Sequence, residues 1–417
     1  MLKSFHCEKR RVLFLSFIIC ERFFQMRLTR IFAATLCVAL FFIGRVDAQD
    51  ADPLAPPDVL KPVPEKYSDA NRLWQGIASL EVARDGGLWA CWYSGGLGEC
   101  GANYVLVAHS GDGGETWSKP IMALDPAGIV RAFDATMWSD PDGKLWLFWA
   151  QGEESTFQPS IWDGRVGVWA MTTTEPEKGV DAEWSAPRRL CNGIMMCKPI
   201  VDSRDRWLFP VSIWRYDSKY KIDEQLRGAD VFISTDKGAT LTFYGRVEVP
   251  RDVSVFDEHN IVERKDGSFW ILNRTTRGIG ESISTDGART WSPFAPSKIK
   301  HTSSRFFVRR LRSGALLLVK NGPINEDVGR SRMTAFISDD DGATWSDGLV
   351  LDERNEVSYP DGGQNDDGTI FVVYDFQRYG AREIYAARFT EEDLRAGKIV
   401  SDVGKLKLLV NKASGAK

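Results

Sequence analysis

Residues 338–345 read Ser-Asp-Asp-Asp-Gly-Ala-Thr-Trp, and three other stretches, which begin at Ser110, Ser234 and Ser284, follow the same pattern. The copy at Ser234 ends in Leu241 instead of tryptophan, and the copy at Ser284 has its glycine one position earlier. Serine and aspartate side chains can bond to nearby backbone N–H groups, glycine accepts a positive φ, and tryptophan can cover the turn. The pattern therefore predicts a tight hairpin turn. A calcium site is the alternative, but each copy supplies too few oxygen ligands.

A second repeat runs out of phase with the first. Six times a turn pair is followed by a run of large apolar residues, which is typical of a strand buried on both faces. The pairs are Gly86-Gly87, Asp142-Gly143, Asp205-Arg206, Asp266-Gly267, Ser313-Gly314 and Asp367-Gly368. They are 47 to 63 residues apart, room for about four short strands that cannot bury both faces alone. The sequence predicts an all-β fold, a six-bladed β-propeller of four-stranded antiparallel blades. A two-sheet sandwich is the alternative, which the regular spacing disfavours.

The composition of the 417 residues fits a folded chain with a large core. Hydrophobic residues make up 43% and charged residues 26%, which excludes whole-chain disorder. Lys and Arg number 53 against 57 Asp and Glu, so no basic excess indicates a nucleic-acid partner. The four histidines are not spaced as metal ligands and no Cys-x-x-Cys or cofactor motif occurs, so neither a metal site nor a cofactor is expected.

The first 48 residues are expected to be a leader outside the fold. From Met26, two arginines precede the apolar run 31–43, and Val46-Asp47-Ala48 supplies small residues for cleavage, as in a signal peptide. This run and the earlier run 12–20 are too short to span a bilayer comfortably, so no stable membrane insertion is expected. The prediction is a secreted or periplasmic protein after cleavage near Ala48. An uncleaved N-terminal anchor is the alternative.

Three segments are expected after the leader. Residues 49–71 are rich in proline and are predicted to be an extended linker. Residues 72–410 are predicted to form the propeller and residues 411–417 a C-terminal tail. Export permits disulfides, and free buried thiols are an equal alternative. The near neighbours in sequence suggest the pairs Cys91–Cys100 and Cys191–Cys197.

The four Ser-x-Asp turns have the pattern of Asp-boxes, and with six blades they make residues 72–400 resemble the sialidase (neuraminidase) superfamily of BNR-repeat propellers. Asp-boxes also occur in other propellers, so activity must be argued from the site. The resemblance implies a glycoside hydrolase whose site lies on the propeller axis. It implies a tyrosine nucleophile with a partner glutamate, an acid/base carboxylate, and three arginines that bind the substrate carboxylate. The implied partner is a glycan or oligosaccharide with an acidic terminal sugar.

Two residues match the nucleophile pair of the superfamily. Tyr359 stands before the turn of blade six in Val-Ser-Tyr-Pro-Asp, and Glu258 stands before the turn of blade four in Glu-His-Asn-Ile-Val-Glu. A phenol with a pKa of about 10 is a weak nucleophile and requires an adjacent base. A neutral phenol also suits an anionic substrate, because a carboxylate in the role of nucleophile would repel the substrate's negative charge. The alternative is a rim aromatic residue and a surface charge.

The arginine triad is matched at two of its three positions. Arg274 directly follows the blade-four apolar run, and Arg330 precedes the last Asp-box, with Arg332 as the alternative in register. A planar guanidinium binds a carboxylate through two parallel hydrogen bonds, which explains the use of arginine. Surface salt bridges are the alternative. The first arginine of the superfamily is missing, because Gly76 stands there.

Three basic residues are candidates to replace the missing arginine in substrate binding. Arg72 lies four residues before Gly76, Arg131 holds the corresponding place in blade two, and Lys198 holds it in blade three. Which of them faces the axis is left open by the sequence.

The acid/base position is altered as well. The superfamily has an aspartate in the loop that follows the second strand of blade one. Glu99 is the only carboxylate of the corresponding loop, residues 94–101, and Asp134 is the second candidate. A glutamate can perform the same proton transfer if the loop shifts by one methylene. A solvated loop carboxylate is the alternative.

These residues predict an exo-acting glycoside hydrolase of sialidase type that cleaves a terminal acidic sugar through a tyrosine nucleophile. The loss at Gly76 weakens the case for sialic acid itself and leaves a uronic acid or another modified sugar open. A polysaccharide lyase with Tyr359 as the base is the first alternative. A non-catalytic glycan-binding propeller is the second, although a lectin has no chemical need for a tyrosine–glutamate pair.

Overall fold

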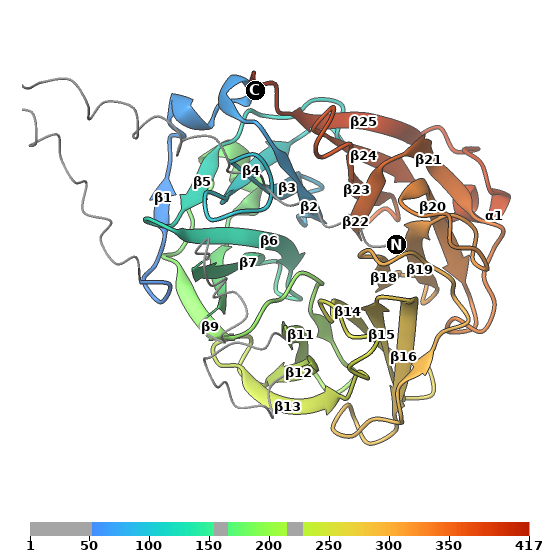
Figure 1. The fold of residues 1–417 in the computed structure, drawn as a ribbon. Helices are drawn as coiled ribbons and strands as arrows, with labels where there is room; N and C mark the ends of the chain where they lie inside the picture. Colours follow the sequence, from blue (N-terminus) through green and yellow to red (C-terminus); the bar gives the residue numbers. More distant parts are fainter. Residues whose placement is uncertain (1–51, 154–165, 215–227, 417) are drawn as a thin grey trace, which may run out of the picture. The chain divides into compact units, whose positions relative to one another are not determined.

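Six antiparallel β-sheets, arranged in a ring around a central axis, make up the described part of the chain (Figure 1). The computed structural model describes residues 52–153, 166–214 and 228–416. The predicted leader, residues 1–48, lies outside the described residues and stays a prediction. The predicted all-β, six-bladed propeller is confirmed. Among the described residues the structure has one short α-helix, α1 (Glu391–Ala396).

Strands that are neighbours in sequence are neighbours in each blade, and the first strand of a blade lies nearest the axis. Blade one contains β2 (Gln75–Val82), β3 (Leu88–Ser94), β4 (Tyr104–Ser110) and β5 (Met122–Asp125). Blade two contains β6 (Val130–Ser139), β7 (Leu145–Glu153), β8 (Gly167–Thr173) and β9 (Arg188–Asn192). Blade three contains β10 (Ile200–Val201), β11 (Trp207–Ile213), β12 (Gly228–Ser234) and β13 (Thr242–Val247).

The other three blades repeat this order. Blade four contains β14 (His259–Glu263), β15 (Phe269–Thr275), β16 (Gly278–Ser284) and β17 (Ala295–Pro296). Blade five contains β18 (Phe307–Arg310), β19 (Leu316–Asn321), β20 (Ser331–Ser338) and β21 (Leu349–Asn355). Blade six contains β22 (Val357–Gln364), β23 (Ile370–Phe376), β24 (Glu383–Phe389) and β25 (Lys405–Lys412). The described ranges also contain the 3₁₀ turns η1 (Glu65–Tyr67), η2 (Asp69–Asn71) and η4 (Pro176–Asp181).

The six predicted apolar runs form the second strand of each blade. Apart from the last residue of β7 and of β23, every residue of these six strands is buried. Both faces of such a strand are covered because each blade packs against the next around the ring, so the runs are continuously apolar and do not alternate.

The four Asp-boxes form the turns between the third and fourth strands of blades one, three, four and five, as the hairpin interpretation predicts. In blade five the Ser338 hydroxyl donates to Asp340 at 2.8 Å and accepts from the Gly342 amide at 2.8 Å. The Thr344 amide and hydroxyl donate to Asp340 at 2.8 and 2.6 Å, and these bonds lower the pKa of Asp340 to about 2. In the Asp-box of blade four, Ala288 occupies the position that glycine has in the other three boxes, and its backbone is left-handed, with φ of 73°.

Part of the stretch predicted to be a linker belongs to blade one. β1 (Asp58–Leu60) pairs with β5 as a fifth strand of that sheet. Tyr67 is 2% exposed in the core of the blade, and its phenol donates to Asp125. A strand of three residues, such as β1, is too short to show an alternation of apolar and polar residues. The proline content of residues 49–71 therefore led to the prediction of a linker.

The C-terminal residues are bonded to the segment that enters blade one. The Ser414 amide donates to the Asp69 carbonyl at 2.7 Å, and the Gly415 amide donates to the Arg72 carbonyl at 3.0 Å. The C-terminal residues therefore hold the segment that leads into β2, where the first and last blades meet and the ring closes.

Three of the innermost strands contain a β-bulge at the same place. Ile77 in β2, Asp134 in β6 and Tyr359 in β22 have φ of 56°, 48° and 56°, and the pairing register shifts at each of them. A bulge re-aims the side chain of the bulged residue. Two of the three bulged residues, Asp134 and Tyr359, are candidate site residues.

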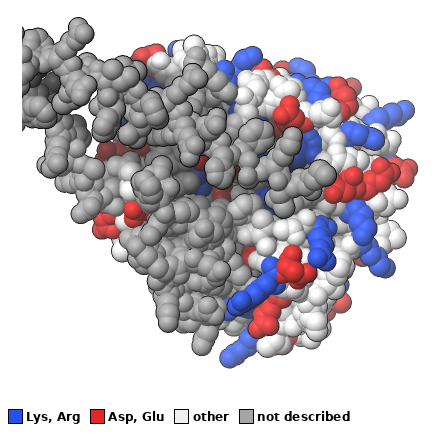
Figure 2. Space-filling view, in the orientation of Figure 1, with Lys and Arg blue, Asp and Glu red and all other residues white. Residues whose placement is uncertain are grey.

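The described surface that faces the viewer in Figure 2 carries acidic and basic side chains in alternation, with no broad patch of one sign. The four cysteines of the described residues, Cys91, Cys100, Cys191 and Cys197, are free thiols, so the suggested disulfide pairs are not formed in this structure. In the described ranges no helix has the length and apolar character needed to cross a membrane.

Candidate active site

Tyr359 occupies a left-handed backbone position on the innermost strand of blade six and is 5% exposed. Such a conformation costs a residue other than glycine about 1–3 kcal/mol and persists only where its surroundings enforce it. The Tyr359 carbonyl accepts a hydrogen bond from Arg305 at 3.1 Å, and the neighbouring Ser358 hydroxyl donates to Asp375 at 2.6 Å. The backbone of Tyr359 is thus held on both sides.

Arg274 joins the two residues of the predicted pair. Its Nη1 donates to Glu258 Oε1 at 2.5 Å and to the Tyr359 hydroxyl at 3.2 Å. The second oxygen of Glu258, Oε2, is buried and has no hydrogen-bond partner among the described residues. The structure therefore brings Tyr359 and Glu258 onto one guanidinium nitrogen, although they are 101 positions apart in sequence.

Arg274 is fixed on its other sides as well. Its Nη2 donates to the Ser303 carbonyl at 3.1 Å, and its guanidinium carbon lies 4.7 Å from the centre of the Phe256 ring. Burial lowers the pKa of Arg274, but the charge of Glu258 and the phenol of Tyr359 outweigh it and raise the pKa overall. The guanidinium therefore keeps its charge in a site where it is 4% exposed.

Arg330 lies on a third side of Tyr359. Its guanidinium carbon is 5.1 Å from the centre of the Tyr359 ring, and within the described ranges no hydrogen bond or ion pair engages its guanidinium. Arg332, the alternative in register, is exposed. The side chain near Tyr359 is thus that of Arg330, and it is available to a ligand.

Asp134 and Arg131 lie on β6, and both are buried. Burial raises the pKa of the Asp134 carboxyl to about 8, opposed by the charge of Arg131 and assisted by those of Glu258 and Glu99. The neighbours of Asp134 on β6, Phe133 and Ala135, belong to the same buried cluster as Tyr359. At neutral pH Asp134 carries a proton, which is the state that a general acid requires.

Glu99 is bound to an arginine that sequence reasoning missed. Glu99 Oε1 accepts a hydrogen bond from Arg378 Nη1 at 2.8 Å, and the guanidinium carbon of Arg378 lies 4.8 Å from the centre of the Tyr359 ring. A signal was present, because Arg378 lies two residues after the apolar strand of blade six, β23, and Arg274 is the penultimate residue of that of blade four, β15.

Two buried cations on the axis hold blades together. Lys198 donates to the carbonyls of Leu80 and Met137 at 2.7 and 2.6 Å and to Glu81 at 2.9 Å, which uses all three of its protons. Arg305, also missed from sequence, donates to the carbonyls of three segments that belong to different blades, those of Ala78, Met196 and Tyr359. Their partners make both side chains structural supports of the site.

Arg72 lies elsewhere in the fold. It is 0% exposed, and its Nη2 donates to Asp69 and to Oδ1 of Asn411, a residue of β25, the last strand of blade six. No contact in the described part joins its side chain to Tyr359. The structure therefore does not bring Arg72 into the group around the tyrosine.

A family model for the BNR repeat-like domain matches residues 86–372. The chain belongs to this family. No curated protein matches the chain. The match begins just before β3 and ends within β23, so it covers the ring apart from the strands that close it.

Solved structures with the same fold as this BNR repeat-like propeller share little sequence with it. A protein of unknown function from Dyadobacter fermentans is 18% identical, with a TM-score of 0.60 over 80% of this chain and 98% of that one. The Hadza microbial sialidase Hz136 is 18% identical, with 0.59 over 74% and 65%. The intramolecular trans-sialidase of Ruminococcus gnavus, in complex with oseltamivir carboxylate, is 16% identical, with 0.57 over 81% and 98%. At these identities the likeness establishes the fold of the BNR repeat-like chain.

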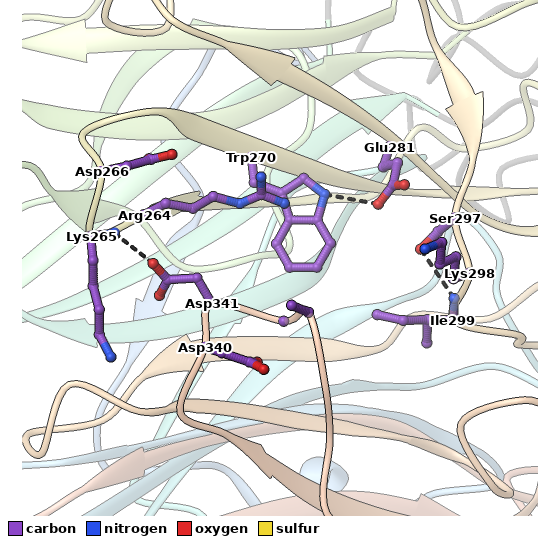
Figure 3. A pocket seen from close by; sticks show the side chains of 12 residues that line it. Arg264, Lys265, Asp266, Trp270, Glu281, Ser297, Lys298, Ile299, Asp340 and Asp341 are labelled. Carbon is purple, nitrogen blue, oxygen red and sulfur yellow. Dashed lines mark hydrogen bonds between the residues drawn. The ribbon is translucent and has the colours of Figure 1, made fainter.

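The BNR repeat-like propeller also has a cavity of about 530 Å³ between blades four and five (Figure 3), and Tyr359 is not among its lining residues. There the Trp270 indole donates to Glu281 at 3.0 Å, and the Lys265 amide donates to Asp341 at 2.7 Å. The Lys265 ammonium donates to the Asp339 carbonyl of the Asp-box turn at 2.8 Å, and the guanidinium carbon of Arg264 lies 4.6 Å from the centre of the Trp270 ring. Among the described residues no group of histidine, cysteine, aspartate or glutamate is arranged to hold a metal ion.

Proposed function

We propose that this propeller is an exo-acting glycoside hydrolase of sialidase type that cleaves a terminal acidic sugar with Tyr359 as its nucleophile. The observation that carries the proposal is the position of Arg274 Nη1, 2.5 Å from Glu258 and 3.2 Å from the Tyr359 hydroxyl. A guanidinium that donates to a phenol oxygen stabilises the negative charge that the oxygen develops as it attacks. The strained backbone at Tyr359 supports a functional role for this residue.

The arginines account for an acidic substrate. Arg274 and Arg330 come from blades four and five and lie on different sides of Tyr359. A carboxylate on the sugar that Tyr359 attacks would receive charged hydrogen bonds from both guanidinium groups. A neutral sugar would leave the unpartnered guanidinium of Arg330 without this interaction.

The first step forms a bond between the Tyr359 oxygen and the anomeric carbon, while the bond to the leaving oxygen breaks. Glu258 accepts the phenolic proton on Oε2, the oxygen without a partner. Asp134 donates its proton to the leaving oxygen, which departs as an alcohol. The products of this step are the alcohol and a glycosyl–tyrosine intermediate.

The second step consumes water and restores the enzyme. Water attacks the anomeric carbon and passes a proton to Asp134, which is now ionised. The Tyr359 oxygen leaves and recovers its proton from Glu258. Two displacements at the same carbon retain the configuration of the sugar.

Asp134 suits the acid role better than Glu99 does. Asp134 is 2% exposed, and burial raises its pKa to about 8, so the carboxyl is protonated at neutral pH. Glu99 instead is 38% exposed and accepts a hydrogen bond from the Arg378 guanidinium at 2.8 Å, so this carboxyl already has a partner. The order of the two candidates from the sequence is therefore reversed in this proposal.

The neighbours support a sialidase-type activity without fixing the sugar. Two of the similar structures are described as a sialidase and an intramolecular trans-sialidase, and a third has no known function. Because the first arginine of the superfamily is absent at Gly76, the substrate class we propose is a terminal acidic sugar, with uronic acids included beside sialic acid.

The test is turnover of fluorogenic 4-methylumbelliferyl glycosides of N-acetylneuraminic, glucuronic and galacturonic acid by the purified protein, with the galactoside as a neutral control. We expect release from at least one acidic glycoside and none from the galactoside. The same assay followed near 235 nm with oligouronides detects the unsaturated product of a lyase, which would replace the hydrolase proposal. Binding of the sugars without any turnover would identify a glycan-binding propeller instead.

We also propose that the chain is exported and cleaved near Ala48. N-terminal sequencing of the protein from its native host should begin at Gln49 or within a few residues of it. Recovery of cytoplasmic protein with residues 1–48 intact would contradict export.

A further inference from the structure

We propose that Arg378, supplied by blade six, takes the place of the missing first arginine and is the third guanidinium of the anion-binding group. The inference rests on the proposed function and names a residue that determines its specificity. The position left empty by Gly76 on blade one is filled by a side chain that enters from the neighbouring blade.

The space at Gly76 is taken by the methylene groups of Arg378. A Cβ atom at Gly76 would lie 2.3 Å from Cδ and 2.7 Å from Cγ of Arg378. The φ of Gly76 is outside the left-handed region, so the backbone accepts any residue and only space excludes a side chain. The absence of a side chain at Gly76 on blade one therefore leaves the space that the Arg378 side chain of blade six occupies.

The guanidinium of Arg378 reaches the nucleophile. Its carbon lies 4.8 Å from the centre of the Tyr359 ring, where that of Arg330 lies at 5.1 Å, and Arg274 donates to the Tyr359 hydroxyl. Three guanidinium groups from blades four, five and six thus surround one tyrosine. Of the candidates from the sequence, Arg72 bonds to Asp69 and Asn411, the guanidinium carbon of Arg131 lies 3.9 Å from the centre of the Phe133 ring, and Lys198 bonds to Glu81 and to two backbone carbonyls.

Arg378 is held in place before any ligand arrives. Its side chain is 9% exposed, its Nη1 donates to Glu99 at 2.8 Å, and its Nε lies 3.6 Å from Asp375 Oδ2. Its Nη2 makes no hydrogen bond within the described ranges. The Glu99 side chain bound to Nη1 is 38% exposed, and Arg378 Nη2 itself is not fully buried, so Nη2 can bind an oxygen of a sugar carboxylate.

Asp375 couples this arginine to the bulges of blades one and six. Its Oδ2 accepts from the Ile77 amide at 3.0 Å, and its Oδ1 accepts from Ser358 at 2.6 Å. One buried carboxylate therefore orients Arg378 and holds the backbone beside Tyr359. Support of this kind keeps a binding group within the narrow range of positions that recognition requires.

The test removes the arginine at position 378 and, in a second variant, introduces an arginine at position 76 instead. Arg378→Met removes the charge and keeps the length, and Gly76→Arg with Arg378→Ala returns the arginine to blade one and clears the space for it. Arg312→Met is the matched control, because Arg312 is an exposed arginine whose partner is Asp366. The probes are the acidic glycoside that the wild type cleaves and free N-acetylneuraminic and glucuronic acid in calorimetric titrations. Thermal melting identifies any variant that fails to fold.

We expect Arg378→Met to raise KM and the dissociation constant of the sugar acid about 30-fold or more. The exchange variant should recover at least tenfold of this loss, and Arg312→Met should match the wild type. Gly76→Arg alone should lose stability, because its side chain meets Arg378. A folded Arg378→Met variant that binds the sugar acids within threefold of wild type overturns the inference, and so does a wild type that binds neither acid. Turnover failure in a wild type that still binds them removes the proposed reaction and leaves Arg378 as a binding residue.

Discussion

Arg274 Nη1 and Glu258 Oε1 form a buried ion pair 2.5 Å long at the centre of the propeller, where the two side chains are 5% and 4% exposed. The pair is reinforced by a backbone bond in which the Arg274 amide donates to the Glu258 carbonyl at 2.8 Å. Removing one member of a buried pair leaves the other charge without compensation. This relationship makes a prediction about stability that is separate from the proposed chemistry.

Glu258→Leu should lower the free energy of unfolding by about 3 kcal/mol or more, because Arg274 is left as a buried, uncompensated charge. The double variant Glu258→Leu with Arg274→Met removes both charges and should recover most of the loss. Urea unfolding followed by tryptophan fluorescence measures both variants. Equal destabilisation by the single and double variants would show that packing and not charge determines the loss.

Tyr359→Phe should abolish turnover and leave the free energy of unfolding nearly unchanged, because it removes one hydroxyl whose partner, Arg274, keeps its bond to Glu258. Since Tyr359 and Glu258 act as a unit in the proposed reaction, Tyr359→Phe with Glu258→Gln should cost little more than either change alone. Single-turnover assays with an aryl glycoside measure this. Near wild-type turnover by Tyr359→Phe would end the covalent-tyrosine hypothesis, and additive losses would indicate separate binding roles.

Asp134 should produce a pH dependence of both stability and rate, because burial raises its pKa to about 8. The folded state then binds one proton more than the unfolded state between about pH 4, the ordinary value for Asp, and pH 8, so stability falls as pH rises through this window. Urea unfolding of Asp134→Asn should show a gain over wild type at pH 8.5 that is absent below pH 4. A gain that does not depend on pH would contradict a buried, protonated carboxyl.

The rate of turnover should also depend on the protonation of Asp134. Wild-type kcat should decline above about pH 8, where Asp134 loses its proton. Asp134→Asn should lose this decline and retain more activity on a phenolic leaving group than on a sugar leaving group, which needs protonation. Glu99→Gln is the comparison, and a larger dependence on the leaving group in that variant would return the acid role to Glu99.

Arg330→Met should raise KM for an acidic glycoside about tenfold or more without lowering the melting temperature, since no described hydrogen bond or ion pair uses its guanidinium. Arg332→Met is the matched control, because Arg332 is exposed and two positions away. The two variants are compared by steady-state kinetics and calorimetry. An equal effect of both would mean that general positive charge, and not a directed contact, attracts the substrate.

Gly342→Ala should destabilise the fold more than Gly267→Ala. Both glycines are left-handed, with φ of 87° and 81°, but a Cβ at Gly342 would lie 2.6 Å from the Trp270 ring, whereas one at Gly267 would meet nothing within 4 Å. Backbone strain alone costs about 1–2 kcal/mol, and the clash should add about 1–3 kcal/mol at Gly342. Urea unfolding that gives the two variants equal losses would show that Trp270 moves aside freely.

The repeats allowed the fold to be predicted, because their determinants are local. In each Asp-box, serine, aspartate and threonine bond to one another and to glycine or alanine within seven positions, and the structure reproduces all four turns. The buried strands were predicted for the same reason, since a continuous apolar run with a turn pair before it needs no distant partner to be recognised. Tyr359, Glu258, Arg274 and Arg330 were identified through the resemblance of their segments to those of the sialidase superfamily. In the structure Arg274 contacts both Glu258 and Tyr359, and Arg330 lies beside the Tyr359 ring.

Ring closure was decided only by the tertiary structure. Gly76 and Arg378 are 302 positions apart, and their contact exists because the first and last blades meet. The partner of Glu99 and the supporting role of Lys198 depend in the same way on side chains from other blades. Local sequence specifies which strands and turns form, because their energies depend on neighbours along the chain. Which guanidinium reaches Tyr359, and which carboxyl keeps its proton, depends on distances and burial across the axis that arise only when six blades close into a ring.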